Sequence, residues 1–234
     1  MDWQHVVEKV KPYVVKIETP SGHGTGFLCL RNKDSSICGI ATAAHVVEHA
    51  HEWQQPVRIQ SYDVDGKILA SALLKEAQRV IRINWHTDSA VIIFPTSELR
   101  LPHGSIPLIP TNIILPIGVE VGWLGFPAIE RFRCCFFSGN VSANDDSRKG
   151  YLIDGVAING VSGGPVIYNT ATDGAAIVGV MTEYRANRRG GEALPGLSFA
   201  QDVSHFHAVI TEARSIDEAK EKAIESPDPK PANA

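Results

Sequence analysis

Glycine, proline and polar turn residues divide the sequence into short apolar runs, each about the length of a β-strand. The 20 glycines and 14 prolines among 234 residues supply such turns along the whole chain. The runs form two successive sets of about six predicted strands, and a proline-rich stretch at residues 95–118 connects the two sets. Since 44% of the residues are hydrophobic, the chain can bury a substantial core. We therefore predict an all-β protein with two β units.

The limits of the predicted strands come from their composition and from the turns between them. The first set covers residues 13–18, 27–30, 37–42, 56–63, 66–75, 79–83 and 90–94, and the second covers residues 119–125, 131–138, 139–143, 150–158, 165–169, 175–183 and 196–200. We interpret the glycine-rich residues 21–26 as a turn and residues 187–191 as a further polar turn.

Helices are predicted near the two ends of the chain. Residues 2–10 place valines on one face, and Pro12 ends that helix. Apolar residues recur at helical spacing after residue 202, where Asp202 is a plausible N-cap. Ser215 and Glu218 match a capping box that opens a second helical run. Residues 226–234 are too polar and proline-rich to fold alone, so we expect a disordered tail there.

One loop, residues 159–165 (NGVSGGP), surrounds a single serine with three glycines. Glycine tolerates positive φ and lets the backbone approach another group closely. Such a loop can present the Ser162 hydroxyl together with backbone N–H groups, which nucleophilic attack on a carbonyl requires. Taken alone, the loop is equally well explained as a turn. A catalytic role requires a base and an orienting acid elsewhere in the chain.

Candidates for those two groups lie in the first set of strands. His45 follows a run of small residues (ATAA) and opens a short helical turn. Asp88 precedes the fully apolar strand at residues 90–94, where a carboxylate at a strand edge can reach a neighbour. Each residue alone has an ordinary structural explanation, as a packed histidine or a turn residue. Their combination with Ser162 favours catalysis.

Four motifs in chain order resemble the chymotrypsin-like (trypsin-like) serine proteases, and the disulfide-free HtrA-type bacterial peptidases are the most similar in style. The motifs are Gly24–Phe27 (GTGF), Thr42–His45 (TAAH), Asp88–Val91 (DSAV) and the loop at residues 159–165. The resemblance extends over residues 13–210. It implies two six-stranded antiparallel β-barrels with the active site between them, a short N-terminal helix and a C-terminal helix.

This resemblance also implies a domain division. Residues 1–100 would hold the N-terminal helix and the first barrel, residues 101–118 the connection and residues 119–201 the second barrel. Residues 202–225 would form the C-terminal helical segment, ahead of the tail at residues 226–234.

The resemblance further implies a Ser-His-Asp triad. Ser162 would be the nucleophile, and His45 would act first as general base and then as general acid. Asp88 would hold the imidazole in the tautomer that leaves one nitrogen free to accept the serine proton. The backbone N–H groups of Gly160 and Ser162 would form the oxyanion hole.

The substrate pocket implied by the resemblance is apolar. Val156 would form its floor, Val180 and Met181 one wall, and Gly196 part of another wall. Burying an unpaired lysine or arginine on an apolar floor is unfavourable, and Met181 should narrow the pocket. We therefore expect a serine endopeptidase that cleaves protein or peptide substrates after small or medium apolar residues, through an acyl-enzyme.

Val161 is a departure from the digestive members of this family, which carry an aspartate just before the serine to pair with a newly freed N-terminus. A valine cannot form that ion pair, so we do not expect propeptide cleavage to be the activation switch. The loop is then either formed constitutively or ordered by an activating or regulatory protein partner. The alternative from another functional class is a catalytically silent protease fold that serves as a binding module.

A zinc peptidase is a third interpretation, because His45, Glu48 and His49 match the H-x-x-E-H motif. The preceding strand and Pro56 leave little room for the long helix that such a site needs. Zinc would also leave the Ser162 loop unexplained. We therefore expect no metal and no cofactor.

The composition narrows the partners and the compartment. A net charge of −4 and a pI of about 6.1 imply no general affinity for nucleic acid or anionic membranes. We find neither a secretory signal nor an apolar run approaching the roughly 18 residues of a membrane helix, and we expect a cytoplasmic protein. Cys29 and Cys38 could bridge across a hairpin, but with Cys134 and Cys135 we expect four free thiols. The sequence does not indicate an oligomeric state.

Overall fold

The computed structural model describes residues 2–63, 65–170, 174–189 and 192–225. Its helices and strands are, in chain order, α1 (Trp3–Val10), β1 (Val14–Thr19), β2 (Gly22–Arg31), β3 (Ile37–Ala43), α2 (Ala44–Glu52), β4 (Val57–Tyr62), β5 (Ile68–Leu74), β6 (Val80–Asn84), β7 (Ser89–Pro95), β8 (Glu120–Gly125), β9 (Cys135–Asp145), β10 (Gly150–Ile153), β11 (Pro165–Thr170), β12 (Gly174–Arg189), β13 (Glu192–Asp202) and α3 (Ser204–Glu225). Short 3-10 helices lie at Lys11–Tyr13, Glu76–Gln78 and Thr96–Glu98.

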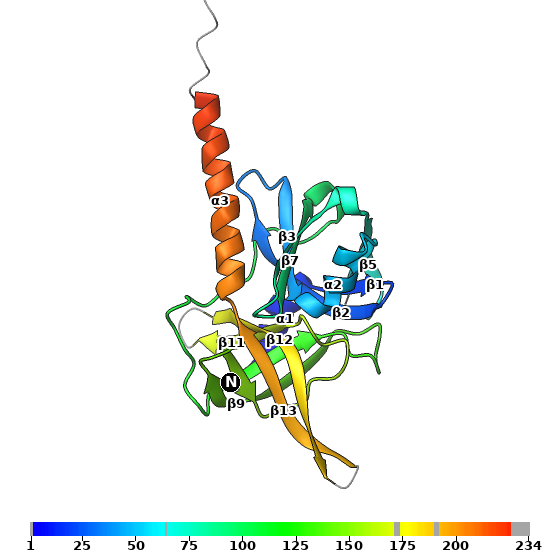
Figure 1. Cartoon of the computed structure of the whole chain (residues 1–234), viewed down its shortest axis with the longest axis vertical. Coiled ribbons are helices and arrows are strands. Elements are labelled where there is room, and N and C mark those ends of the chain that lie inside the picture. The colour runs from blue at the N-terminus through cyan, green and yellow to red at the C-terminus, as the bar shows by residue number, and fades with distance from the viewer. Residues whose placement is uncertain (1, 64, 171–173, 190–191, 226–234) are drawn as a thin grey trace, which may run out of the picture.

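The strands form two antiparallel sheets, one from each predicted set. β10, β13, β12, β11, β8 and β9 close into a six-stranded barrel, as predicted for the second unit. The first unit is a seven-stranded sheet in the order β5-β4-β1-β2-β3-β7-β6, and no ladder joins its end strands in the described residues. The chain passes from β5 to β6 through the 3-10 helix at Glu76–Gln78. Figure 1 shows this sheet above the barrel, with α3 rising along its side.

The predicted turn at residues 21–26 is wrong for residues 22–26, which lie in β2, while Ser21 does lie in a turn. The glycines serve close packing within the strand. A Cβ on Gly24 would lie 2.6 Å from a methyl carbon of Val46, and one on Gly26 would lie 2.7 Å from Ile17. Strand residues that must pass so close to their neighbours cannot carry a side chain.

Two boundaries in the barrel also differ from the prediction. Residues 139–143 do not form a separate strand, because β9 runs without a break from Cys135 to Asp145. Gly139 lies inside it, where a Cβ would collide with the carbonyl of Asp154. β10 ends at Ile153, not at residue 158. Of the polar turn predicted at residues 187–191, residues 187–189 belong to β12 and residues 190–191 lie outside the described residues.

The C-terminal region forms one helix, so the predicted capping box at Ser215 and Glu218 is wrong. The Ser215 hydroxyl donates to the Thr211 carbonyl one turn earlier, which a serine inside a helix can do. At the start of α3, the Ser204 N–H donates to Asp202 Oδ1 over 3.1 Å. The tail predicted at residues 226–234 lies outside the described residues.

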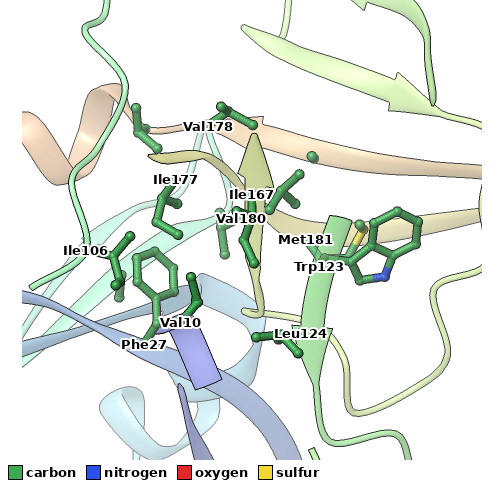
Figure 2. Packing of buried hydrophobic residues seen from close by; sticks show 14 of the residues in the cluster. Val10, Phe27, Ile106, Trp123, Leu124, Ile167, Ile177, Val178, Val180 and Met181 are labelled. Atoms are coloured by element: carbon green, nitrogen blue, oxygen red, sulfur yellow. The ribbon is translucent and has the colours of Figure 1, made fainter. Parts of the chain in front are cut away.

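One hydrophobic cluster joins the two sheets to the helices (Figure 2). It contains Val10 of α1, Phe27 of β2, Trp123 of β8 and Val180 of β12. Phe27 packs edge-on against Phe206 of α3, with ring centroids 5.8 Å apart. A second cluster lies within the seven-stranded sheet and along α2. Because the first cluster is shared, the packing between the two sheets fixes their relative position.

All four cysteines are free thiols, as predicted. Cys29 Sγ lies 3.4 Å from the Gly39 carbonyl, and Cys38 pairs with Arg31 in the ladder of β2 with β3, so the two cysteines are not opposite each other. Among the described residues, the structure contains no helix with the length and apolar character needed to cross a membrane.

Candidate active site

His45 lies on the first turn of α2, directly after the end of β3. Ala43 and Ala44 are almost completely buried, so the small residues seen in the sequence allow the helix to start against the sheet. Val46 packs on Gly24 of β2. The His45 side chain itself is 43% exposed. The strand end and the helix thus hold the imidazole at the surface, with a packed turn beneath it. α2 has nine residues, so it is longer than the predicted turn.

Asp88, which lies 43 residues after His45 in the sequence, caps the N-terminus of α2. The N-cap residue, Ala43, has no side chain that can accept the first N–H groups of the helix. The Ala44 N–H donates instead to the Asp88 carbonyl over 3.0 Å, and the His45 N–H donates to Asp88 Oδ1 over 2.9 Å. A carboxylate at a helix N-terminus is also favoured by the helix dipole. Asp88 has a φ of 44°, a left-handed conformation that aspartate tolerates better than most residues.

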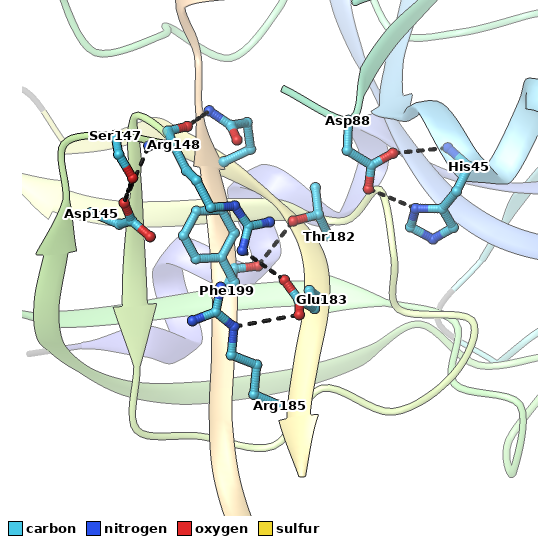
Figure 3. A network of polar contacts seen from close by, with 10 residues as sticks. His45, Asp88, Asp145, Ser147, Arg148, Thr182, Glu183, Arg185 and Phe199 are labelled. Carbon is cyan, nitrogen blue, oxygen red and sulfur yellow. Dashed lines mark hydrogen bonds and ion pairs between the residues drawn. The ribbon is translucent and has the colours of Figure 1, made fainter. Parts of the chain in front are cut away.

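The second oxygen of Asp88 binds the imidazole. Asp88 Oδ2 lies 2.7 Å from His45 Nδ1, and Figure 3 shows both contacts between the residues. If Nδ1 donates this bond, Nε2 carries the lone pair of the neutral ring. The hydrogen bond to Asp88 raises the pKa of His45, and burial opposes that effect without reversing it. The pair has the geometry of a general base held by a carboxylate.

The loop at residues 159–165 has four consecutive carbonyls with donors. Asn159 O accepts from Ala128 N at 2.6 Å, Gly160 O from Thr25 Oγ1 at 2.7 Å, Val161 O from Gly164 N at 2.9 Å and Ser162 O from Thr25 N at 2.8 Å. The Val161 side chain is fully buried and packs against Gly125. Val161, the residue directly before the serine, therefore anchors the loop by burial.

The N–H groups of the same loop are divided into bonded and unbonded ones. The Val161 N–H donates to the Ile158 carbonyl, and the Gly163 N–H donates to the Met181 carbonyl over 2.7 Å. No hydrogen-bond acceptor for the N–H of Gly160 or of Ser162 occurs among the described residues. Two unbonded N–H groups on alternate residues can bind an oxyanion.

The residue after Ser162, Gly163, packs against the residues that precede His45. A Cβ on Gly163 would collide with Thr42 Oγ1 and would lie 3.1 Å from the N atom of Ala43, two residues before His45. The loop therefore packs against the strand end that leads into α2. Within the described part of the chain, no hydrogen bond joins Ser162 to His45. The structure brings His45 and Asp88 together and places the Ser162 loop beside them.

The residues expected to form the substrate pocket have unequal exposure. Val156 is 49% exposed, while Val180 and Met181 are fully buried in the shared hydrophobic cluster. Neither of the two buried residues therefore presents a surface to a substrate in this structure. Gly196 lies tightly against the Arg185 carbonyl, where a Cβ would collide. The pocket stays a prediction.

A group of charged residues in the barrel was not indicated by the sequence. Glu183 of β12 pairs with Arg148 at 2.9 Å and with Arg185 at 3.4 Å (Figure 3). The Arg148 guanidinium also lies 3.9 Å from the ring centroid of Phe199. Arg148 lies 35 residues before Glu183, and the ladder of β12 with β13 and the β9–β10 turn bring it to Glu183 and Phe199. The lining of an apolar cavity of about 1020 Å³, which includes Trp3, does not include His45, Asp88 or Ser162.

Thr25 was also missed as a site residue, although the GTGF motif contains it. It is fully buried in β2, and its hydroxyl reaches a loop 135 residues away. A buried polar residue within an apolar strand is a recognisable signal, because such groups require partners. The sequence alone does not locate the partner.

Comparison with known proteins gives a family and a fold. A family model described as a trypsin-like peptidase domain matches residues 24–180. The solved structure of Deg5 is similar with a TM-score of 0.62 at 21% identity, over 86% of this chain and 89% of that one. An inactive form of a serine-to-alanine mutant of Rv3671c from M. tuberculosis H37Rv has a TM-score of 0.57 at 20% identity, over 88% and 90%. The comparison with curated proteins found no match. At these identities the structural likeness concerns the fold.

Proposed function

Because the chain belongs to the trypsin-like peptidase domain family, we propose that it is a serine endopeptidase that uses Ser162, His45 and Asp88. One observation carries the proposal. The Ser162 loop has two N–H groups without acceptors among the described residues and packs against the strand that leads into His45. The hydrogen bond between His45 and Asp88 supports the same assignment.

In this mechanism each residue moves or stabilises a defined charge. His45 Nε2 accepts the proton of the Ser162 hydroxyl while the Ser162 oxygen attacks the substrate carbonyl. The N–H groups of Gly160 and Ser162 bind the resulting oxyanion. Protonated His45 then donates its proton to the leaving amine, which yields the acyl-enzyme. Asp88 stabilises the imidazolium through Nδ1, and water releases the acyl group in the reverse sequence of proton transfers.

The expected specificity is for small or medium apolar side chains ahead of the cleaved bond. Val156 is the exposed member of the predicted pocket and carries no charge to pair with lysine or arginine. A library of peptides that differ at this one position tests the specificity. Cleavage after arginine alone would contradict it.

The second candidate function is a protease fold that is silent or that needs a protein partner to become active. The observation in its favour is the missing hydrogen bond between Ser162 and His45 among the described residues. Catalytic hydrogen bonds are often long in free enzymes and shorten when substrate binds, so this observation is weaker than the loop geometry.

The zinc alternative has less support. Among the described residues, no three histidine, cysteine or acidic side chains gather closely enough to hold a metal ion. The motif residues His45 and His49 bind Asp88 and Gln55 through Nδ1. A chelator therefore belongs in the test of function.

Labelling with a fluorophosphonate probe tests the proposal on the full chain. We expect the wild type to be labelled and Ser162→Ala to be unlabelled, with a chelator having no effect on either. Folded wild type that resists labelling would favour the silent or partner-dependent protein. Peptidase activity that persists in Ser162→Ala but disappears with chelator would replace the serine mechanism with the zinc one.

A further inference from the structure

We propose that Thr25 is the positioning residue of the oxyanion loop, an inference that rests on the proposed function. Thr25 is fully buried in β2 and touches the loop through both its side chain and its backbone. It does not contact the reacting atoms. It acts through the Gly160–Val161 and Ser162–Gly163 peptide planes.

Thr25 binds two carbonyls of the loop, that of Gly160 and that of Ser162 itself. Its Oγ1 donates to the Gly160 carbonyl over 2.7 Å, and its N–H donates to the Ser162 carbonyl over 2.8 Å. The hydroxyl also accepts from the Phe126 N–H over 2.9 Å, so both its donor and its acceptor capacity are used. Thr25 is therefore bonded to both sides of the loop and to the residue after β8.

The backbone of Thr25 is fixed in turn by the first sheet. The Thr42 hydroxyl donates to the Thr25 carbonyl over 2.7 Å, and Thr42 lies three residues before His45. This chain of bonds runs from the base of the His45 turn, through Thr25, to the loop that carries Ser162. It crosses from the seven-stranded sheet to the barrel within buried surroundings, where such bonds are strongest.

Holding these carbonyls restricts where the unbonded N–H groups point, in addition to two bonds within the site: Ala128 N–H to the Asn159 carbonyl and Gly164 N–H to the Val161 carbonyl. A peptide unit is planar, so a fixed Gly160 carbonyl sets the plane that joins Gly160 to Val161. A fixed Ser162 carbonyl sets the plane that joins Ser162 to Gly163. The plane that carries the Ser162 N–H lies between these two, and the Gly160 N–H precedes the first. Gly160 and Gly163 both have positive φ, and glycine allows the planes to rotate if the bonds to Thr25 are lost.

Three substitutions separate the hydroxyl of Thr25 from its shape. Thr25→Val keeps the shape but leaves the Gly160 carbonyl and the Phe126 N–H without partners. Thr25→Ser keeps the hydroxyl and loses only a methyl group. Thr25→Cys keeps a weak S–H donor and provides an intermediate case if the valine variant does not fold.

The rate of fluorophosphonate labelling of Ser162 measures the effect on the oxyanion loop. We expect Thr25→Val to lower the maximal labelling rate by about 10- to 1000-fold, up to the loss seen when an oxyanion donor is removed. Probe affinity and the pH midpoint of the reaction should stay as in the wild type, because His45 and Asp88 are untouched. Thr25→Ser should recover the rate to within about threefold, and Thr25→Cys should fall between the two.

Hydrogen exchange of the 158–164 segment supplies a readout that does not depend on activity. We expect exchange to accelerate by about tenfold or more in Thr25→Val, and in Thr25→Cys to a smaller degree, while Thr25→Ser matches the wild type. Wild-type exchange and labelling in Thr25→Val would overturn the role of Thr25. A wild type that is not labelled, combined with faster exchange in Thr25→Val, would overturn the proposed function and leave the role of Thr25 in the loop intact.

Discussion

Asp88 combines a structural contact with a chemical one at the scale of a single residue. One carboxylate oxygen accepts the His45 backbone N–H, and the other binds the imidazole. Asp88 thus both caps the N-terminus of α2 and orients the base. Its left-handed backbone conformation limits replacement to residues that tolerate positive φ, mainly glycine, asparagine and aspartate.

Asp88→Asn separates these two duties. The amide oxygen can still cap α2, and asparagine accepts the left-handed conformation, so the unfolding temperature should change by only a few degrees. The neutral amide cannot stabilise the imidazolium or fix the tautomer, so we expect activity to fall by about 10⁴-fold. Fluorophosphonate labelling and thermal unfolding measure the two effects. A labelling rate within tenfold of the wild type would contradict the assignment of Asp88.

The pH dependence follows from the hydrogen bond between His45 and Asp88, which raises the pKa of His45 above its ordinary 6.5. Only neutral His45 can act as the general base, so activity should rise with pH to a plateau, with a midpoint above 6.5. The ion pair between protonated His45 and Asp88 also stabilises the fold. This stabilisation is complete below pH 6.5 and is lost as the pH rises through the raised pKa of His45. Labelling rates measured between pH 5 and 9 test the predicted activity profile. In Asp88→Asn, the midpoint of the residual activity should move to a lower pH. A wild-type midpoint below 6.5 would contradict it.

At the scale of elements, the Ser162 loop depends on Gly163 for two separate reasons. Gly163 has a φ of 87°, and a Cβ there would collide with the Thr25 carbonyl and the Thr42 hydroxyl. Gly118 provides a matched control, because its φ is 88° but a Cβ there would meet nothing within 4 Å. The two sites therefore share the conformational strain and differ in the collision.

Gly118→Ala should cost about 1 kcal/mol of unfolding free energy, from the left-handed conformation alone. Gly163→Ala should cost about 1 to 3 kcal/mol more, because the loop must move away from β2 and β3. Urea unfolding of both variants measures the difference. Equal losses would show that the loop accommodates the methyl group, and that its packing on the first sheet is looser than the structure indicates.

The elements that the sequence predicted best are those with a local signal. The two sets of strands, the amphipathic start of α1 and the small residues before His45 all follow from composition and spacing. The start of β2 and the continuity of β9 were missed because Gly24, Gly26 and Gly139 serve contacts with residues of other elements. The candidate triad came from motif order, whereas the role of Thr25 depends on a partner that no local pattern reveals.

At the scale of the whole molecule, the site depends on how the two sheets are held together. The buried cluster of Figure 2 links α1, β2 and the barrel, and the bonds of Thr25 cross the same boundary. α3 joins this assembly in two ways. Phe206 is fully buried against Phe27 of β2, and Arg82 of β6 pairs with Glu212 at the surface.

These two contacts of α3 should contribute very differently to stability. Phe206→Ala removes a fully buried ring and should lower the unfolding free energy by about 3 to 5 kcal/mol. Arg82→Ala breaks an ion pair in which both side chains are 48% exposed, and it should cost less than about 1 kcal/mol. Urea unfolding at low and high salt measures both losses, and only the Arg82→Ala loss should shrink as salt rises.

Because Phe27 lies two residues after Thr25, Phe206→Ala should also slow Ser162 labelling in protein that remains folded. A folded Phe206→Ala variant with the wild-type labelling rate would show that α3 stabilises the sheets without influencing the site.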